Sequence, residues 1–390
     1  MNDLIQLPFK QPDPLQVPLE ALELQRQGAI VRVLTATGDE AWLASGYARV
    51  RKLLSDDRFG RTHRDPESAP RATASAFGGP LGNFVTEYAD HARMRSLLQP
   101  HFSPRRIRAL APRISAHTRR VLDDLERQGP RADLHTHVAL PLPLLVICEL
   151  LGVPFADRAD FRTWAEDASD VTDRDRSGRG VGQLFTYAME LVTRKRKSPE
   201  DDLISRLCAM DDVPDHEAAM ATMSLLFAGH ETTVIQIDMG VLMLLANPGE
   251  WESLVADPGL VPNAVEEIMR APAKAGFGLP RYARTDVEID GVDIRAGDLV
   301  LLDISAANHD PAMFAEPERV EIRRAEAAQH LTFGHGLRYC LGAPLARLEL
   351  QEVLSQLISR FPTLSLDGKV EDLTTRNGIA GGLLELPVRW

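Results

Sequence analysis

The sequence predicts a mainly α-helical protein with a small β portion. In most of residues 87–260, and again after residue 342, apolar residues recur at three- and four-residue steps, the spacing of helices that bury one face. Segments 29–45 and 285–305 instead have the composition and turn residues of β-hairpins. No linker-like segment separates these parts, so we expect all 390 residues to form one domain.

The N-terminal third is predicted to contain a hairpin and a long loop. In residues 29–45 two strand-like runs flank a Thr-Gly-Asp turn. Residues 61–83 are rich in Arg, Pro, Ser, Ala and Gly, which predicts a loop. Loops of this length in compact domains are often functional.

The central part is predicted to be helical, with breaks at residues 129–131, 153–155, 174–180 and 211–214. Its most apolar stretch, 138–154, is short for a membrane span and is interrupted by Pro141, Pro143 and Glu149. We therefore expect a buried helix that begins at the prolines.

The C-terminal part is predicted to begin with the second hairpin, at 285–305, which contains Asp-Gly and Ala-Gly-Asp turns. A proline-rich meander follows and leads to a glycine-rich loop at 333–342. The loop precedes an amphipathic helix, and the chain ends in short strand-like pieces.

Composition excludes several classes of protein. The chain has 44 basic and 56 acidic residues, a formal net charge of −12, which argues against nucleic-acid binding. Its three cysteines are too few and too widely spaced for a disulfide framework or a zinc site, and they fit a reducing compartment. The N-terminus has no signal-peptide pattern. We expect a soluble, cytoplasmic protein without a membrane or nucleic-acid partner.

The loop FGHGLRYCLG, residues 333–342, places Cys340 just before a helical segment. A helix N-terminus offers partial positive charge and free N–H groups, which stabilise a thiolate. Gly342 removes a side chain near the sulfur, and Phe333 is placed to cover one side of it. A buried cysteine at a strand-to-helix turn is the simpler alternative. The whole pattern instead suits a thiolate presented to a flat apolar ligand.

This loop closely resembles the haem-binding loop of the cytochrome P-450 family, Phe-Gly-x-Gly-x-(His/Arg)-x-Cys-x-Gly. The resemblance implies that Cys340 is the proximal thiolate ligand of the iron of haem b. Such a ligand favours O–O cleavage. It also implies the cytochrome P-450 fold, a helical haem domain with minor β-sheets, which would span residues 1–390.

A second resemblance lies in the segment EEIMR, residues 266–270. Glu267 and Arg270 share one helix face and can form an ion pair, which on a surface would contribute little. The segment is similar to the structural Glu-x-x-Arg motif of the family. The third member of that network would be Arg324, in preference to Arg323.

A third resemblance lies in LLFAGHETT, residues 225–233, where glycine and threonine are unfavourable for a helix. A helix end at Gly229 is the alternative. The segment is similar to the family's (Ala/Gly)-Gly-x-(Asp/Glu)-Thr motif on the helix that crosses the distal haem face. The resemblance implies that Ala228 and Gly229 make room for dioxygen and that Glu231 and Thr232 relay protons.

In a fourth, DHARMRSLL, His91 and Arg95 lie four residues apart on one helix face. One interpretation is that both side chains are solvated. The resemblance to the family instead implies that they are the pair that binds the haem propionates. Arg281 and Arg338 fall at further propionate-binding positions. Arg338 replaces the family's commoner histidine, and the preceding TEYAD lacks the usual Asp-Pro-Pro-Glu pattern.

Together these motifs imply a monooxygenase of the actinobacterial secondary-metabolism type. It would use dioxygen and two electrons from an external ferredoxin, with its reductase and NAD(P)H. The expected reaction is hydroxylation or epoxidation of a sizeable natural product: a polyketide or macrolide, a peptide-like or an aromatic metabolite. The alternatives are a peroxide-using haem-thiolate enzyme and a non-catalytic haem-thiolate sensor.

Two surfaces complete these expectations. The ferredoxin would dock on the proximal side near Arg105, Arg106 and Arg108. The substrate would meet residues 61–86, 169–180, 274–278 and 377–382, regions that contact substrates in the family. Polar groups on the substrate would meet Asp170, Asp173, Arg174 and Lys274.

Overall fold

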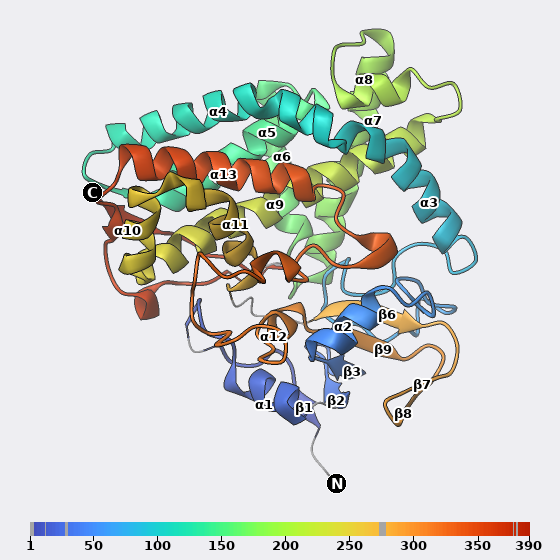
Figure 1. Cartoon of the computed structure of the whole chain (residues 1–390). Coiled ribbons are helices and arrows are strands. Elements are labelled where there is room, and N and C mark those ends of the chain that lie inside the picture. The colour runs from blue at the N-terminus through green and yellow to red at the C-terminus, as the bar shows by residue number, and fades with distance from the viewer. Residues whose placement is uncertain (1–3, 12, 28–29, 273–277, 377, 380) are drawn as a thin grey trace.

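Helices make up most of the fold, and the strands that Figure 1 labels gather at one side of it. The computed structural model describes residues 4–11, 13–27, 30–272, 278–376, 378–379 and 381–390. The expected mainly helical class with minor sheets is confirmed. Among the described residues, no helix is both long enough and apolar enough to cross a membrane.

The helices, in chain order, are α1 (Leu19–Gln27), α2 (Tyr47–Leu54), α3 (Glu87–Leu98), α4 (Pro104–Arg127), α5 (Pro141–Leu151), α6 (Arg158–Ala168), α7 (Arg174–Lys197), α8 (Leu203–Cys208), α9 (Asp215–Ala246), α10 (Pro248–Ala256), α11 (Val261–Arg270), α12 (Ile304–Asn308) and α13 (Ala343–Arg360).

Helix α9 is the centre of the helical part. It has 32 residues, and its C-terminal half is buried on every side, as expected of a core helix. Helices α5, α7 and α11 pack against it, while α4 and α13 lie side by side along the upper edge in Figure 1. The apolar helix expected within 138–154 is α5, and Pro141 occupies its first turn, where a missing N–H costs nothing.

The strands are β1 (Ile5–Gln6), β2 (Val31–Leu34), β3 (Glu40–Ala44), β4 (Phe59–Gly60), β5 (Arg131–Asp133), β6 (Leu279–Ala283), β7 (Val287–Ile289), β8 (Val292–Ile294), β9 (Leu299–Leu302), β10 (Ser365–Leu366) and β11 (Pro387–Arg389). In the described part of the chain, the largest sheet has the order β1-β2-β3-β9-β6-β4.

Both expected hairpins form. Strands β2 and β3 pair antiparallel around the Thr-Gly-Asp turn, with Val31 opposite Leu43. Strands β7 and β8 pair across Asp290 and Gly291, both of which have positive φ, as a tight two-residue turn requires. Strand β9 follows this hairpin in the chain and lies between β3 and β6 in the largest sheet. The predicted loop is also present, since residues 61–86 form no helix or strand.

The predicted break at 174–180 is wrong, because helix α7 begins at residue 174. The Asp173 side chain caps this helix by accepting hydrogen bonds from the N–H groups of Asp175 and Arg176. A Cβ on Gly180 would lie 2.7 Å from the backbone oxygen of Trp164. The glycine therefore allows α6 and α7 to approach closely and does not mark a loop.

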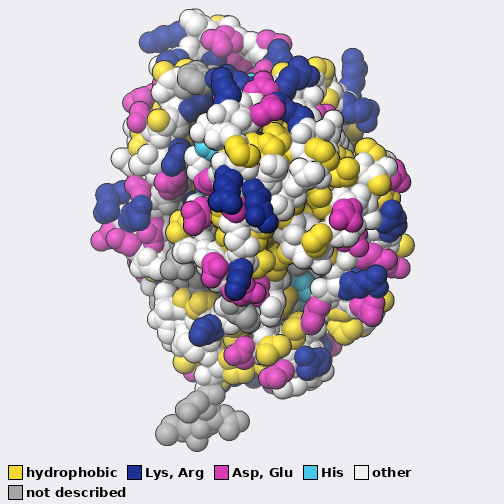
Figure 2. Space-filling model, turned by 90° about the vertical axis from the view of Figure 1, so that its left-hand side faces the viewer, with side chains coloured by type: hydrophobic (Ala, Val, Ile, Leu, Met, Phe, Trp, Pro, Cys, Tyr) yellow, Lys and Arg dark blue, Asp and Glu magenta, His cyan; other side chains and the backbone are white. Residues whose placement is uncertain are grey.

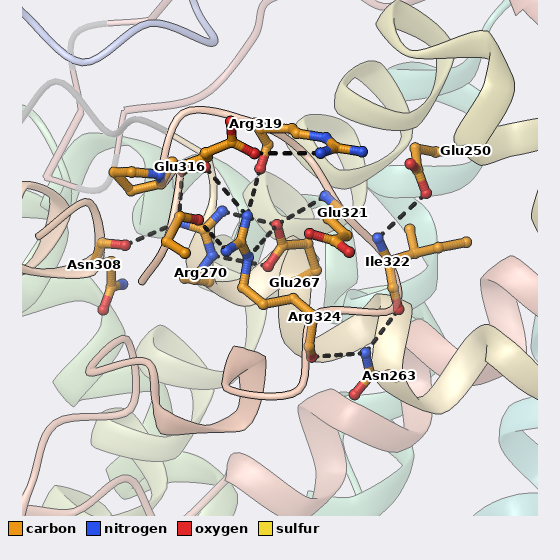
Figure 3. A network of polar contacts seen from close by, with 12 residues as sticks. Glu250, Asn263, Glu267, Arg270, Asn308, Glu316, Arg319, Glu321, Ile322 and Arg324 are labelled. Carbon is orange, nitrogen blue, oxygen red and sulfur yellow. Dashed lines mark hydrogen bonds and ion pairs between the residues drawn. The ribbon is translucent and has the colours of Figure 1, made fainter. Parts of the chain in front are cut away.

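A buried ion-pair network ties α11 to the meander that leads to the Cys340 loop (Figure 3). Arg270 donates from Nε and Nη2 to the two oxygens of Glu267, at 2.8 Å each. Arg324 approaches Glu267 at 3.3 Å, and Arg270 also donates to the Asn308 carbonyl at 2.9 Å. The expectation of Arg324 over Arg323 is confirmed, since Arg323 is exposed. Loss of one partner of such a buried pair costs about 3–5 kcal/mol.

The surface carries charges of both signs. On the face shown in Figure 2, basic and acidic side chains are interspersed, with hydrophobic side chains between them. That face has no basic stripe of the kind that tracks a nucleic-acid backbone.

The contact between α6 and α7 predicts the effect of two matched substitutions. Gly180→Ala should lower the free energy of unfolding by about 1–3 kcal/mol, because the methyl group meets backbone atoms. Gly182→Ala, where nothing lies within 4 Å, should raise it by about 0.5–1 kcal/mol. Chemical denaturation of the two variants measures both changes. Equal effects of the same sign would contradict the packing role of Gly180.

Candidate active site

A cavity of about 270 Å³ separates α9 from the Cys340 loop and the start of α13. One wall consists of α9 residues of the LLFAGHETT segment, and the opposite wall contains Phe333, Cys340 and Gly342. Two motifs more than 100 residues apart in the sequence therefore face each other across one space. Lining residues from the predicted set are Ala228, Gly229, Thr232, Phe333, Cys340 and Gly342.

The thiol of Cys340 faces this cavity, and the side chain is accordingly accessible. Burial among the surrounding atoms raises its pKa, while the N–H groups of Gly342 and Ala343 at the start of α13 lower it by hydrogen bonding. The Cys340 N–H donates to the Phe333 carbonyl at 2.8 Å. Backbone N–H groups at the start of α13 thus face the sulfur, and its role as a thiolate ligand stays a prediction.

Two glycines and Arg347 determine the shape of the Cys340 loop. Gly334 and Gly336 have φ of 73° and 71°, a region that favours glycine. Arg347 of α13 lies over the Phe333 ring, 4.6 Å from its centroid, and its Nε is 2.6 Å from Oε1 of Glu266. This contact fixes the ring next to the sulfur, and Arg347 was not among the predicted site residues.

On the distal wall the structure separates the predicted proton-relay pair. The Thr232 hydroxyl reaches the cavity and donates to the Ala228 carbonyl at 2.9 Å. Glu231 is buried behind it, and its carboxylate accepts a hydrogen bond from Arg376 at 3.1 Å. Burial raises the pKa of Glu231, and the Arg376 charge opposes that rise. Direct transfer between the two side chains does not follow from this arrangement.

Gly229 has a second role beside lining the cavity. A Cβ at this position would lie 2.7 Å from Cδ1 of Ile147 on α5. The glycine therefore keeps α5 and α9 in close contact at the level of the cavity, which the sequence alone did not predict.

The buried Arg281 and the half-buried Arg61, Arg338 and His91 meet near the Cys340 loop, with fewer carboxylates to balance them. Burial, followed by repulsion from Arg61 and Arg338, lowers the pKa of Arg281 to about 9. Arg338 pairs with Glu87 at 2.5 Å, but no carboxylate of the described chain lies within ion-pair distance of Arg281 or Arg61. His91 has a buried Nδ1 without a hydrogen-bond partner. Such an excess of buried and half-buried cations suits a ligand that carries carboxylates.

Arg95 lies at the edge of this cluster and donates to the Tyr339 carbonyl at 2.9 Å, so it also supports the Cys340 loop. Sequence reasoning missed Arg61, Glu87 and Arg284. Arg284 pairs with Glu87 at 2.8 Å. None of the three belongs to a recognised motif. Glu87 lies four residues before His91 on α3, so helix spacing places it there, whereas only the fold brings Arg61 and Arg284 to Glu87.

Two of the predicted substrate-contacting segments lie beside the cavity. Phe77, in the 61–86 loop, stacks on Phe227 of α9 with ring centroids 4.6 Å apart. Gly378 lies behind Glu231, where a Cβ would come within 3.3 Å of Oε1. Lys274 and most of the 274–278 segment lie outside the described residues.

The sequence model of the family described as "Cytochrome P450" matches residues 252–388. Pentalenolactone synthase of Streptomyces exfoliatus is 41% identical over 398 residues, which cover 100% of both chains. The chain belongs to the cytochrome P450 family. Mycinamicin IV hydroxylase/epoxidase of Micromonospora griseorubida is 38% identical over 94% of this P450 and 94% of the relative.

Solved structures agree over the whole length of this P450. A putative thioether synthase of griseoviridin tailoring has a TM-score of 0.92 at 36% identity, with 100% of both chains covered. The substrate-free pimaricin epoxidase, a cytochrome P450, has a TM-score of 0.89 at 38% identity, again over 100% of both chains. The expected fold is confirmed, and the protein is a P450 monooxygenase, an oxidoreductase.

Haem is the cofactor of this family, and the residues at the site fit it. The thiol of Cys340 faces the cavity beneath backbone N–H groups. Arg281 and the unpartnered His91 nitrogen offer binding groups for propionate carboxylates.

Glu349 of α13, also at the cavity, predicts a pH dependence of stability. Burial raises its pKa to about 8, whereas an unfolded glutamate has a pKa of about 4.3. The folded protein therefore keeps this proton as the unfolded chain loses it. Between these two values stability should fall with rising pH, by up to about 1.4 kcal/mol per pH unit. Glu349→Gln should remove this part of the dependence.

Urea unfolding of the haem-loaded protein between pH 5 and pH 8 measures it. Glu352→Gln, on the same helix but hydrogen-bonded to Gln356, is the control and should retain the wild-type slope. A Glu349→Gln variant with that same slope would contradict the prediction.

Proposed function

We propose that this P450 holds haem b through Cys340 and hydroxylates or epoxidises a sizeable natural product. The observation that carries the proposal is the cavity in which the Cys340 thiol and the Thr232 hydroxyl face one another. Two relatives are named for related chemistry, the mycinamicin IV hydroxylase/epoxidase and the pimaricin epoxidase. Both names support oxygenation of a large scaffold here.

When bound, haem supplies the activation of dioxygen and the oxidation of a C–H or C=C bond. The chain supplies the surroundings. Cys340 binds the iron, and the N–H groups of Gly342 and Ala343 stabilise its thiolate. Phe333 covers the sulfur side of the site, and Ala228 and Gly229 leave space on the opposite side.

His91, Arg95, Arg281 and Arg338 bind the two propionates in this proposal. Arg281 has the strongest support, because it is 4% exposed and lacks a carboxylate partner in the described chain. Arg61 joins this set, since burial and the neighbouring Arg338 lower its pKa. Bound carboxylates would relieve the repulsion among these cations.

In this proposal Thr232 and Glu231 take part in proton delivery at different positions along one path. The Thr232 hydroxyl is at the cavity, where it can order a water molecule. Glu231 lies behind it and pairs with Arg376, whose side chain is 24% exposed. Arg376 thus gives the buried carboxylate a connection to solvent, and intervening water would carry the proton to Thr232.

The electron donor in this proposal is an acidic ferredoxin that draws electrons from NAD(P)H through its reductase. Arg105, Arg106 and Arg108 are exposed at the start of α4. Opposite charges on the two partners would accelerate their encounter in a salt-dependent way.

The assignment of Cys340 predicts a spectral change. Cys340→Ser should abolish the strongly red-shifted Soret band of the reduced protein under carbon monoxide, because that band requires thiolate ligation. Cys148→Ala, in the core of α5, should keep it. The reduced-minus-oxidised spectrum under carbon monoxide is the measurement. Persistence of the band in Cys340→Ser would refute the assignment.

The role of Thr232 predicts uncoupling. Thr232→Ala should keep NAD(P)H consumption but lower product formed per NAD(P)H by about tenfold or more, with peroxide formed in its place. Thr222→Ala is the control, since its hydroxyl lies on the same helix, is buried away from the cavity and donates to the Ala218 carbonyl at 2.8 Å; it should remain coupled. Peroxide and product are quantified together. Unchanged coupling in Thr232→Ala would remove Thr232 from the proton path and favour a peroxide-using enzyme.

A further inference from the structure

A second, larger cavity lies on the surface between the 61–86 loop and the beginning of α7. Its volume is about 630 Å³. Three arginines line it, Arg71 from the loop and Arg174 and Arg179 from α7, together with the acidic residues Glu67 and Asp175. Their formal charges leave one positive charge in excess.

These three arginines differ from their neighbour Arg176. That residue pairs with Asp167 at 2.7 Å and with Asp170 at 3.1 Å. Within the described residues, by contrast, no carboxylate lies within ion-pair distance of Arg71, Arg174 or Arg179. Asp167 and Asp170 pair with Arg176, and Asp173 caps α7. Asp175 lines the cavity without an ion pair to any described residue, so the three guanidinium groups remain available to an anion.

Arg71 is built into this surface cavity. It donates from Nη2 to the Ser75 carbonyl at 2.6 Å, and its buried Nε has no partner. A Cβ on Gly79 would lie 2.8 Å from the guanidinium carbon, so the glycine leaves the space that Arg71 fills. Burial, and then the charge of Arg174, lower the pKa of Arg71. The two cations are therefore close enough to repel each other, and an anion between them would be stabilised.

The 61–86 loop and α9 connect the walls of this surface cavity and of the one at Cys340. The loop is joined to α7 by the hydrogen bond from the Ala76 N–H to the Ser177 hydroxyl, at 2.9 Å. The next residue, Phe77, stacks on Phe227 of α9, which precedes the cavity-lining Ala228. This stacked pair thus connects a segment that lines the surface cavity, through Ala76, with a segment that lines the inner one, through Ala228.

We propose that the substrate carries a carboxylate and that Arg71, Arg174 and Arg179 bind it in the surface cavity. This inference rests on the proposed function and specifies its substrate class. A single carboxylate neutralises the one excess charge, whereas a phosphate dianion would exceed it. Guanidinium groups also match the planar carboxylate through paired N–H donors. A protein of net charge −12 repels anions at long range, so a local cluster of cations is needed to admit one.

The inference predicts that carboxylic acids bind better than their esters. The probes are abietic acid and dodecanoic acid, each with its methyl ester, applied to haem-loaded protein whose carbonyl band is recorded separately. Equilibrium dialysis measures binding in either cavity, and the haem spin state reports arrival at the inner one. Each acid should bind at least about tenfold more tightly than its ester, and the preference should shrink as salt rises.

The variant is Arg174→Gln/Arg179→Gln, because both side chains are exposed and neither has a hydrogen bond to a described residue that would be lost. It should reduce acid binding about tenfold and leave ester binding unchanged. The control is Lys197→Gln/Lys369→Gln, which removes the same charge from exposed positions outside the surface cavity. It should retain the acid preference.

Three outcomes would overturn the inference: equal binding of acid and ester by the wild-type protein, an unchanged preference in the arginine variant, or binding of neutral macrolides while both acids fail to bind. None of these removes the carbonyl band or the turnover of a neutral substrate. Loss of the band in the wild-type protein would instead refute the proposed haem-thiolate function and leave the dialysis result standing.

Discussion

The geometry of the site depends on the buried ion pairs of Glu267 with Arg270 and Arg324. These charges lie where water cannot solvate them, so each must keep its partner. Arg270 also binds the Asn308 carbonyl, which ties α11 to α12, and Arg324 fixes the meander that continues into the Cys340 loop. The position of the sulfur is therefore set by contacts remote from it. A buried pair of this kind contributes specificity of position more than net stability.

Arginines without a carboxylate partner in the described chain occur in two places, beside Cys340 and at the surface cavity. Beside Cys340, the buried Arg281 and the half-buried Arg61 have no carboxylate partners in the described chain, and haem propionates would balance them. At the surface cavity Arg71 and Arg174 repel each other in the same way. In both places repulsion between cations raises the free energy of the folded protein, and a bound anion would lower it. An anionic ligand would thereby stabilise the fold as well as occupy the site.

The sequence could predict the fold class, both hairpins, the apolar helix α5 and the partner residues Glu267, Arg270 and Arg324. These features depend on local periodicity, on turn residues or on motifs of fixed spacing. Prediction failed at residues 174–180, where glycines suggested a break. Gly180 instead serves the contact between α6 and α7, and a contact between two helices leaves no local signal that distinguishes it from a turn.

The sequence by itself determined which chemical groups are present: a cysteine in a glycine-rich loop, a threonine within a core helix and basic residues four apart. The tertiary structure decided which of them meet. It brought Thr232 to the cavity and turned Glu231 toward Arg376, and it gathered Arg61 and Arg284 around Glu87. It also placed Arg71 opposite α7. The physical reason is that burial and long-range charge interactions depend on distances between segments, which spacing along the chain does not specify.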